Sequence, residues 1–149
     1  MTGDRVSYTL ESSLESVNRA ERAAERFAAQ SGLQEDALQE FAMAVREATI
    51  NAVLHGNAYD PCKTVQVTFE CQPEALEVTV RDQGKGFDLA SVPDPLAPEN
   101  LLKQSGRGIF LIRTYMDEVR FRNLNPGMEM VLIKRVRGKS ADDKEKGKS

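Results

Sequence analysis

The stretch Glu47-Ala-Thr-Ile-Asn51-Ala-Val-Leu-His55-Gly56-Asn57 closes a segment with strong helical periodicity. At about 100° per residue, Glu47, Asn51 and His55 fall at i, i+4 and i+8, which predicts a row of polar side chains on one side of a helix. A solvated polar face would show the same pattern. The opposite arc is mostly apolar and is expected to face a core; its members are Leu38, Phe41, Ala42, Val45, Thr49, Ala52 and Val53.

The length of 149 residues predicts one domain over residues 1–136. Residues 137–149 are polar and charged apart from Ala141, which predicts a disordered tail. The 20 Lys+Arg and 23 Asp+Glu give a net charge of −3, so no strong field would gather nucleic acid. No apolar leader and no run of about 18 apolar residues is found, which predicts a cytoplasmic protein without a membrane segment.

Alternation and turn residues define the remaining elements. We expect strands at 6–10, 64–71 and 75–82, helices at about 12–30, 35–56 and 109–116, and a hairpin of 118–123 and 128–136. Ser12 and Glu15 have the spacing of a capping box, and the buried stripe of the first helix is expected to start at Leu14. Helices and hairpins do not follow βαβ order, so we predict an α+β fold, a two-layer sandwich with helices on one face of a mixed, mostly antiparallel sheet.

A buried carboxylate is expected at the end of one strand. Asp82 is in phase with Leu76, Val78 and Val80, so it points to the core side. An unpaired carboxylate there would cost several kcal/mol, so it needs a donor. That donor is either the backbone of the following turn or a ligand group such as an exocyclic amine. Gly84 then begins a G-x-G spacing that lets a ligand lie against the backbone.

A second glycine motif, Gly106-Arg107-Gly108, opens the short third helix. Free N–H groups at a helix start and the charge of Arg107 suit a phosphate, although the spacing differs from that of a P-loop. The proline-rich segment 88–105 before it is long for a loop in a compact domain. Its position between two glycine motifs favours a functional lid.

Together these segments resemble the N, G1 and G2 boxes of the GHKL ATP-binding superfamily, which has the Bergerat fold. The boxes are Glu47-x-x-x-Asn51-Ala52, Asp82-x-Gly84-x-Gly86 and Gly106-x-Gly108, in the family's order over about residues 40–116. Within the superfamily, the chain is most similar to bacterial anti-sigma factor serine/threonine kinases, the switch-protein kinases of partner-switching systems. That likeness extends from Val6 to Arg135 and is carried by residues 51–57, 94–102, 105–108 and 115–119.

The resemblance implies roles for individual residues. Asn51 would hold Mg²⁺ against the triphosphate of ATP, and Glu47 would act as general base or orient the acceptor hydroxyl. Asp82 would accept a hydrogen bond from the adenine amine. The other residues implied to bind the nucleotide are Gly84, Gly86, Gly106, Arg107 and Gly108.

The resemblance also implies protein partners. These are a STAS-type anti-sigma antagonist that is phosphorylated, a sigma factor or other effector that is sequestered, and a second copy of the chain in a homodimer, with no direct nucleic acid and no membrane. One alternative is an ATP-binding sequestering module without kinase activity, against which Glu47 argues. The other is a hydrolase or a histidine-kinase catalytic fragment. Phe110, where those proteins commonly have glycine, and the absence of a helix carrying an acceptor histidine argue against it.

Overall fold

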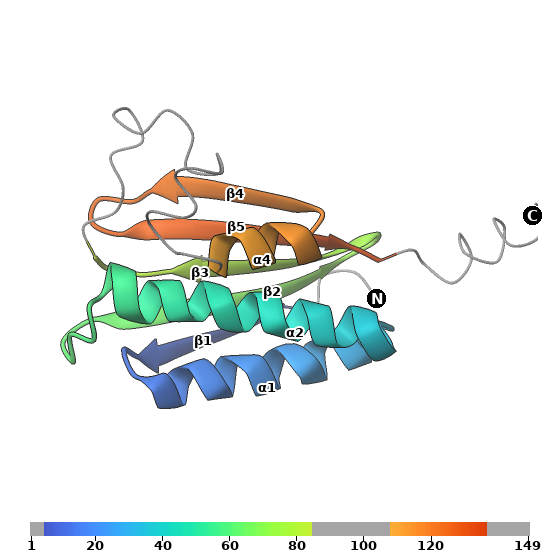
Figure 1. Cartoon of the computed structure of the whole chain (residues 1–149), viewed down its shortest axis with the longest axis horizontal. Coiled ribbons are helices and arrows are strands. Elements are labelled where there is room, and N and C mark those ends of the chain that lie inside the picture. Colours follow the sequence, from blue (N-terminus) through green and yellow to red (C-terminus); the bar gives the residue numbers. More distant parts are fainter. Residues whose placement is uncertain (1–4, 85–107, 137–149) are drawn as a thin grey trace, which may run out of the picture.

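The computed structural model describes residues 5–84 and 108–136 (Figure 1). Its elements are β1 (Arg5–Glu11), α1 (Leu14–Gln30), α2 (Glu35–Ile50), the π-helix η1 (Asn51–Gly56), β2 (Thr64–Gln72), β3 (Ala75–Arg81), α4 (Gly108–Tyr115), β4 (Glu118–Asn123) and β5 (Met128–Arg135). Each predicted element is present. The predicted lid and the predicted polar tail lie outside the described residues.

The strands form one five-stranded sheet in the order β1-β2-β3-β5-β4. All four pairings are antiparallel, so the prediction of a mixed sheet is wrong in that detail, while the α+β sandwich is confirmed. α1, α2 and α4 lie on the same face of the sheet (Figure 1). In this register Val67 pairs with Val80 and Val80 with Met130, so the apolar set of each strand faces the helices.

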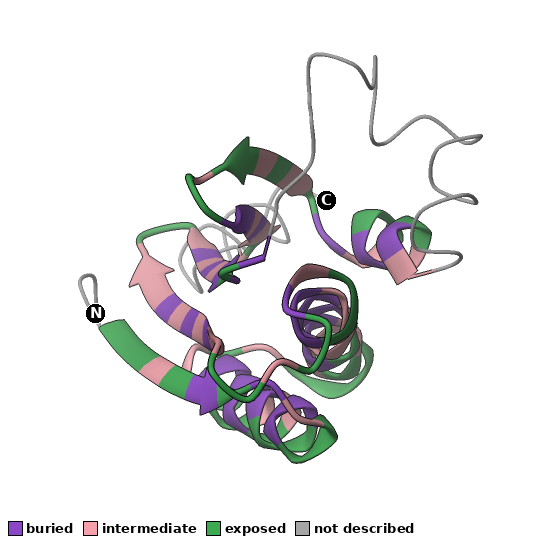
Figure 2. Cartoon of the chain, turned by 90° about the vertical axis from the view of Figure 1, so that its left-hand side faces the viewer, coloured by how far each residue is buried: buried purple, intermediate pink, exposed green. Residues whose placement is uncertain are grey.

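The core lies between the sheet and the helices, where buried residues line both layers (Figure 2). The predicted apolar arc of α2 is confirmed, since its members Phe41 and Val45 are fully buried in this core. Leu14 is 57% exposed, so its place in the buried stripe was predicted wrongly. It lies in the first turn of α1, which begins one residue after the cap, and the buried stripe starts instead at Ser16 and Val17.

The start of α1 differs from the predicted capping box. Ser13 is the N-cap and accepts a hydrogen bond from the Ser16 backbone N–H. The Ser12 hydroxyl instead donates to the Lys63 carbonyl at 2.6 Å and is buried. The neighbouring serine can cap the helix equally well, which leaves Ser12 free to connect this corner to the start of β2.

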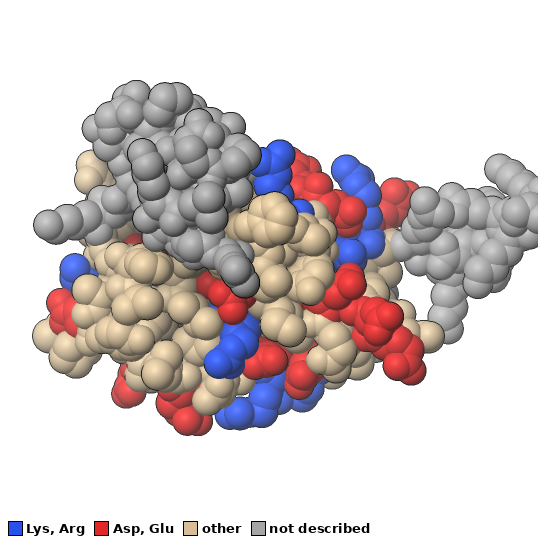
Figure 3. Space-filling view, in the orientation of Figure 1, with Lys and Arg blue, Asp and Glu red and all other residues tan. Residues whose placement is uncertain are grey.

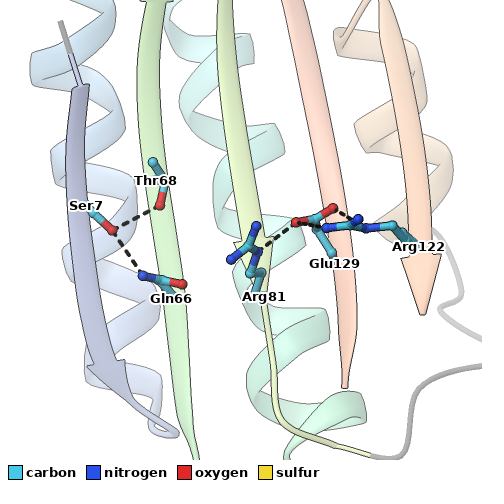
Figure 4. Close-up of polar contacts among 6 residues, drawn as sticks. All are labelled: Ser7, Gln66, Thr68, Arg81, Arg122 and Glu129. Carbon is cyan, nitrogen blue, oxygen red and sulfur yellow. Dashed lines mark hydrogen bonds and ion pairs between the residues drawn. The ribbon is translucent and has the colours of Figure 1, made fainter. Parts of the chain in front are cut away.

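The other face of the sheet is not covered by the described helices and has polar contacts between its strands (Figure 4). Glu129 on β5 accepts hydrogen bonds from Arg81 Nε at 2.7 Å and from Arg122 Nε at 3.0 Å. Burial alone would raise the pKa of Glu129, but the bonds and charges of Arg81 and Arg122 outweigh burial and hold it below the ordinary value. This cluster therefore ties β3, β4 and β5 together directly behind the end of β3.

We expect Glu129→Gln to lower the free energy of unfolding by about 1 kcal/mol at neutral pH. The value is modest because the Arg81 and Arg122 side chains are 45% and 64% exposed. A carboxyl whose pKa is lowered in the folded state stabilises that state at pH values above its unfolded pKa. This stabilisation is lost as the pH falls through the folded pKa. Urea unfolding of both proteins should thus show a difference that shrinks on acidification; a difference that is constant with pH would contradict this assignment.

None of the helices within residues 5–84 and 108–136 combines the length and the hydropathy that a bilayer crossing needs. On the helical face, acidic and basic side chains of the described residues are interspersed rather than gathered by sign (Figure 3).

Candidate nucleotide-binding site

The segment from Glu47 to Asn57 does not stay α-helical to its end. α2 ends at Ile50 and continues as the π-helix η1, whose wider turns are closed by bonds such as Asn57 N–H to the Ala52 carbonyl at 2.8 Å. The predicted α-helix is therefore wrong from Asn51 onward in its hydrogen-bond pattern, whereas Asn51 and His55 still share one side, as the row predicted. The wider turn brings Asn51, His55 and Gly56 to the wall of the same cavity.

That cavity lies between η1, β3, β5 and α4 and has a volume of about 860 Å³. This is within the range of small-molecule sites, roughly 300–1,000 Å³. Asn51 and Asp82 both line it, as do His55 in η1 and Lys63 in the loop that follows η1. Its apolar wall consists of Ala48, Ala52, Val80, Ile109, Met128 and Met130. A flat apolar ring with a polar edge would be complementary to this mixture.

Asp82 is the buried acid of the cavity, at 7% exposure. Its Oδ1 accepts hydrogen bonds from the backbone N–H groups of Gly84 at 2.9 Å and Met128 at 3.2 Å. Burial raises the pKa of the Asp82 carboxyl, and these two bonds and the charge of Lys63 offset only part of that effect. Among the described residues no bond is made to Oδ2. The local cap considered from the sequence is thus present, and the second oxygen is left for a ligand donor.

Two glycines allow the end of β3 to approach η1 closely. A methyl group added at Gly84 would lie 1.9 Å from the Gly56 carbonyl oxygen, and one added at Gly56 would lie 2.2 Å from Asp82 Oδ2. Both distances are far shorter than any van der Waals contact. Glycine is therefore required at Gly84 for packing against Gly56, beyond the predicted role of lining a pocket.

Glu47 and Asn51 meet at the start of α4. A methyl group added at Gly108 would lie 3.1 Å from Glu47 Oε1 and 3.9 Å from both Asn51 Nδ2 and Asn51 Oδ1. Glu47 does not line the cavity itself but lies beside Asn51 at its edge. The first N–H groups of a helix have no partner within the helix, so the start of α4 suits a phosphate at this end of the site.

Within the described residues, Asn51 has an unsatisfied polar group in the cavity wall. Its Nδ2 is buried and has no hydrogen-bond partner in the described part of the chain, which is costly unless a ligand supplies one. Residues 5–84 and 108–136 contain no group of three acidic, histidine or cysteine side chains that could hold a metal alone. A Mg²⁺ ion here would fit only with Asn51 Oδ1 as a protein ligand and with phosphate and water oxygens completing its shell.

The structure thus brings together Glu47, Asn51, Asp82, Gly84 and Gly108. Gly86, Gly106 and Arg107, which the resemblance assigns to adenine and phosphate, lie outside the described residues.

Sequence reasoning assigned no role to Asn57, Gly56, Met128 or Met130. The alternation of β5 could have identified the two methionines, because it places both on the core side, with Met130 opposite Val80 and Met128 next to Asp82. The contact of Gly56 with Asp82 had no signal in the sequence.

Comparison with known proteins places this site in a family. Residues 10–134 match the histidine kinase-like ATPase domain. The chain belongs to this family. Among other histidine kinase-like ATPases, the serine-protein kinase RsbW of Bacillus subtilis (strain 168) is 32% identical over 121 residues, covering 77% of this chain and 75% of RsbW. The anti-sigma F factor of Anoxybacillus flavithermus (strain DSM 21510 / WK1) is 34% identical over 106 residues, covering 68% and 71%.

The fold of this histidine kinase-like ATPase is also found in solved structures. The crystal structure of the RsbU and RsbW domains of a Mycobacterium tuberculosis protein aligns with a TM-score of 0.67 at 17% identity, covering 91% of this chain and 33% of that one. The predicted resemblance, to the GHKL superfamily and within it to anti-sigma serine kinases, is confirmed by the family match and by the names of these relatives.

Proposed function

We propose that this chain is an ATP- and Mg²⁺-dependent serine/threonine protein kinase that also sequesters a regulator as an anti-sigma factor. The observation that carries the proposal is that one cavity has Asp82 in its apolar part and Asn51 near the start of α4, where Glu47 also lies. An adenine base and a metal-bound triphosphate need these two environments at opposite ends of one site. The names of the relatives, serine-protein kinase and anti-sigma F factor, support the same function.

At the base end, adenine would lie between Val80, Ala52 and Met130, with its exocyclic amine donating to Asp82. The carboxylate is already held by Gly84 and Met128 through Oδ1, so it is oriented before the ligand binds. A charged acceptor in a cavity with apolar walls strengthens such a bond and makes it selective for a base that carries a donor.

At the phosphate end, Asn51 would hold Mg²⁺, which neutralises charge on the phosphate oxygens during transfer. The substrate hydroxyl oxygen attacks the γ-phosphorus, the bond between that phosphorus and the β–γ bridging oxygen breaks, and ADP leaves. Glu47 accepts the hydroxyl proton or orients the hydroxyl. Gly108 leaves room beside both side chains, which suits a reaction that relies on positioning and charge rather than on covalent catalysis.

The acceptor in this proposal is a Ser or Thr of a STAS-type antagonist, and the sequestered effector is a sigma factor. A phosphate placed in the interface would weaken binding of the antagonist through repulsion and desolvation, so that the kinase becomes free to hold the sigma factor. Such partners work in the bacterial cytoplasm, where we place the chain, and we propose that it acts as a homodimer, as the resemblance implies.

A phosphotransfer assay with γ-labelled ATP, Mg²⁺ and a candidate STAS antagonist tests this function. Label should appear on a Ser or Thr of the antagonist and require both the chain and Mg²⁺. Free phosphate without labelled antagonist would indicate a hydrolase. ATP binding with neither product, tested with antagonists from the same genome, would indicate the non-catalytic binding module.

A further inference from the structure

We propose that Asn57 is a positioning residue that sets the base selectivity of the site by fixing Asp82 for the adenine amine. This inference rests on the proposed ATP site. Asn57 follows η1 and is 1% exposed, yet neither the predicted boxes nor the proposed chemistry gives it a role.

The amide group of Asn57 makes all its hydrogen bonds within the protein. Its Nδ2 donates to Ser12 Oγ at 2.9 Å and to the Thr64 carbonyl at 2.9 Å, and its Oδ1 accepts from the Gln83 backbone N–H at 2.8 Å. Ser12 in turn donates to the Lys63 carbonyl. One buried amide therefore joins the β1–α1 corner, the start of β2 and the residue after β3. Because both amide hydrogens are used, Asn57 has none left to donate to a base.

The bond to Gln83 is the one that reaches the cavity. Gln83 lies between Asp82 and Gly84, whose backbone N–H holds the Asp82 carboxylate. In the same turn, Gly56 packs so closely against Gly84 and Asp82 that neither glycine could carry a methyl group. Asn57 is the next residue after Gly56, and Gln83 is the residue before Gly84. The hydrogen bond between Asn57 and Gln83 and the close packing of Gly56 on Gly84 therefore hold the same two segments together.

This clamp determines where the Asp82 carboxylate points. A hydrogen bond to an exocyclic amine weakens steeply with angle, so a small rotation of the strand end would cost base selectivity before it cost the fold. Asp82 Oδ1 would still be bonded to Met128 without Asn57, but the turn through Gln83 would lose the hydrogen bond from its backbone N–H to Asn57 Oδ1. The effect of Asn57 should therefore pass through Asp82 and be specific to the amine.

A double-mutant cycle on the full chain tests this, with Asn57→Ala, Asp82→Asn and the double variant. Two nucleotides are compared by calorimetry in the presence of Mg²⁺: ATP and purine riboside 5′-triphosphate, which lacks the amine. We expect Asn57→Ala to weaken ATP binding about tenfold and to leave purine riboside triphosphate binding within about twofold. In the Asp82→Asn background, Asn57→Ala should cause no further loss of ATP affinity.

Ser12→Ala is the matched control, because it removes two hydrogen bonds of the same network on the side away from Asp82. It should lower the urea midpoint and leave the preference for ATP over the purine analogue unchanged. If Asn57→Ala does not fold, Asn57→Ser, which keeps a small hydroxyl in the buried space, takes its place in the cycle.

The outcomes separate the positioning role from the ATP site. Equal weakening of both nucleotides by Asn57→Ala, additive losses with Asp82→Asn, or an equal loss of selectivity in Ser12→Ala would overturn the role of Asn57 while leaving the site in place. If Asp82→Asn itself leaves ATP affinity unchanged, the adenine assignment fails and the positioning role fails with it.

Discussion

Glu47→Gln is expected to slow phosphoryl transfer to the antagonist by about 10²- to 10⁴-fold while ATP affinity stays near that of the wild type. Gln has the size of Glu and keeps its hydrogen-bonding oxygen, but it cannot accept a proton from the hydroxyl. Binding should be preserved because Glu47 lies beside Gly108 at the edge of the cavity and is not part of its wall. Single-turnover transfer from labelled ATP gives the rate, and calorimetry gives the affinity.

Glu40→Gln is the control for this experiment. Glu40 lies on the same helix α2, two turns before Glu47, and is likewise partly exposed. It should leave both the transfer rate and ATP affinity unchanged. Transfer at the wild-type rate in Glu47→Gln would contradict the role of this carboxylate as the base, although the chain would still be a kinase.

Asp82→Asn is expected to weaken ATP binding about 10- to 100-fold, the loss of one charge-assisted hydrogen bond. The Asn side chain keeps an oxygen that can accept from Gly84 and Met128, so the turn itself should be retained. The amide loses the second acceptor, which the adenine amine would use. Calorimetric titration with Mg²⁺ and ATP measures the change, and wild-type affinity in this variant would contradict the adenine assignment.

The same substitution should not destabilise the nucleotide-free protein at neutral pH. Burial raises the pKa of the Asp82 carboxyl in the folded state. Any contribution of this carboxyl to the free energy of unfolding is therefore present below the unfolded pKa and is lost as the pH rises through the folded pKa. Because burial disfavours the charged form of Asp82, its carboxyl adds no stability at high pH that the neutral Asn would lose. Urea unfolding should show equal or greater stability for Asp82→Asn; a clear loss would mean that the charge stabilises the apo fold.

Much of the fold could be predicted because its elements have unambiguous periods. The alternation of residues 64–71 and 75–82 determines which side chains face the helices, and it places Asp82 on the core side without reference to any relative. The sheet order was harder to predict. β5 lies between β3 and β4, and nothing in the local pattern of 128–136 distinguishes that position from an edge.

Site residues were predicted where they belong to a sequence motif, and features that depend on tertiary packing were missed. Asn51 and Asp82 were predicted because each has a box that specifies it, and both line one cavity, while their roles stay a prediction. The π-helix was not found, because no pattern in residues 51–56 distinguishes the wider turn from an ordinary α-helical one. Ser12 was assigned to a helix cap that Ser13 takes, so its bond to Asn57 was not visible from sequence.

The most direct test of the central claim is a crystal structure of this chain with Mg²⁺ and a non-hydrolysable ATP analogue. We predict the adenine amine within hydrogen-bonding distance of Asp82, the metal coordinated by Asn51, and the γ-phosphate facing Glu47 at the start of α4. A nucleotide bound outside the cavity of Asn51 and Asp82, or a metal held without Asn51, would contradict the account.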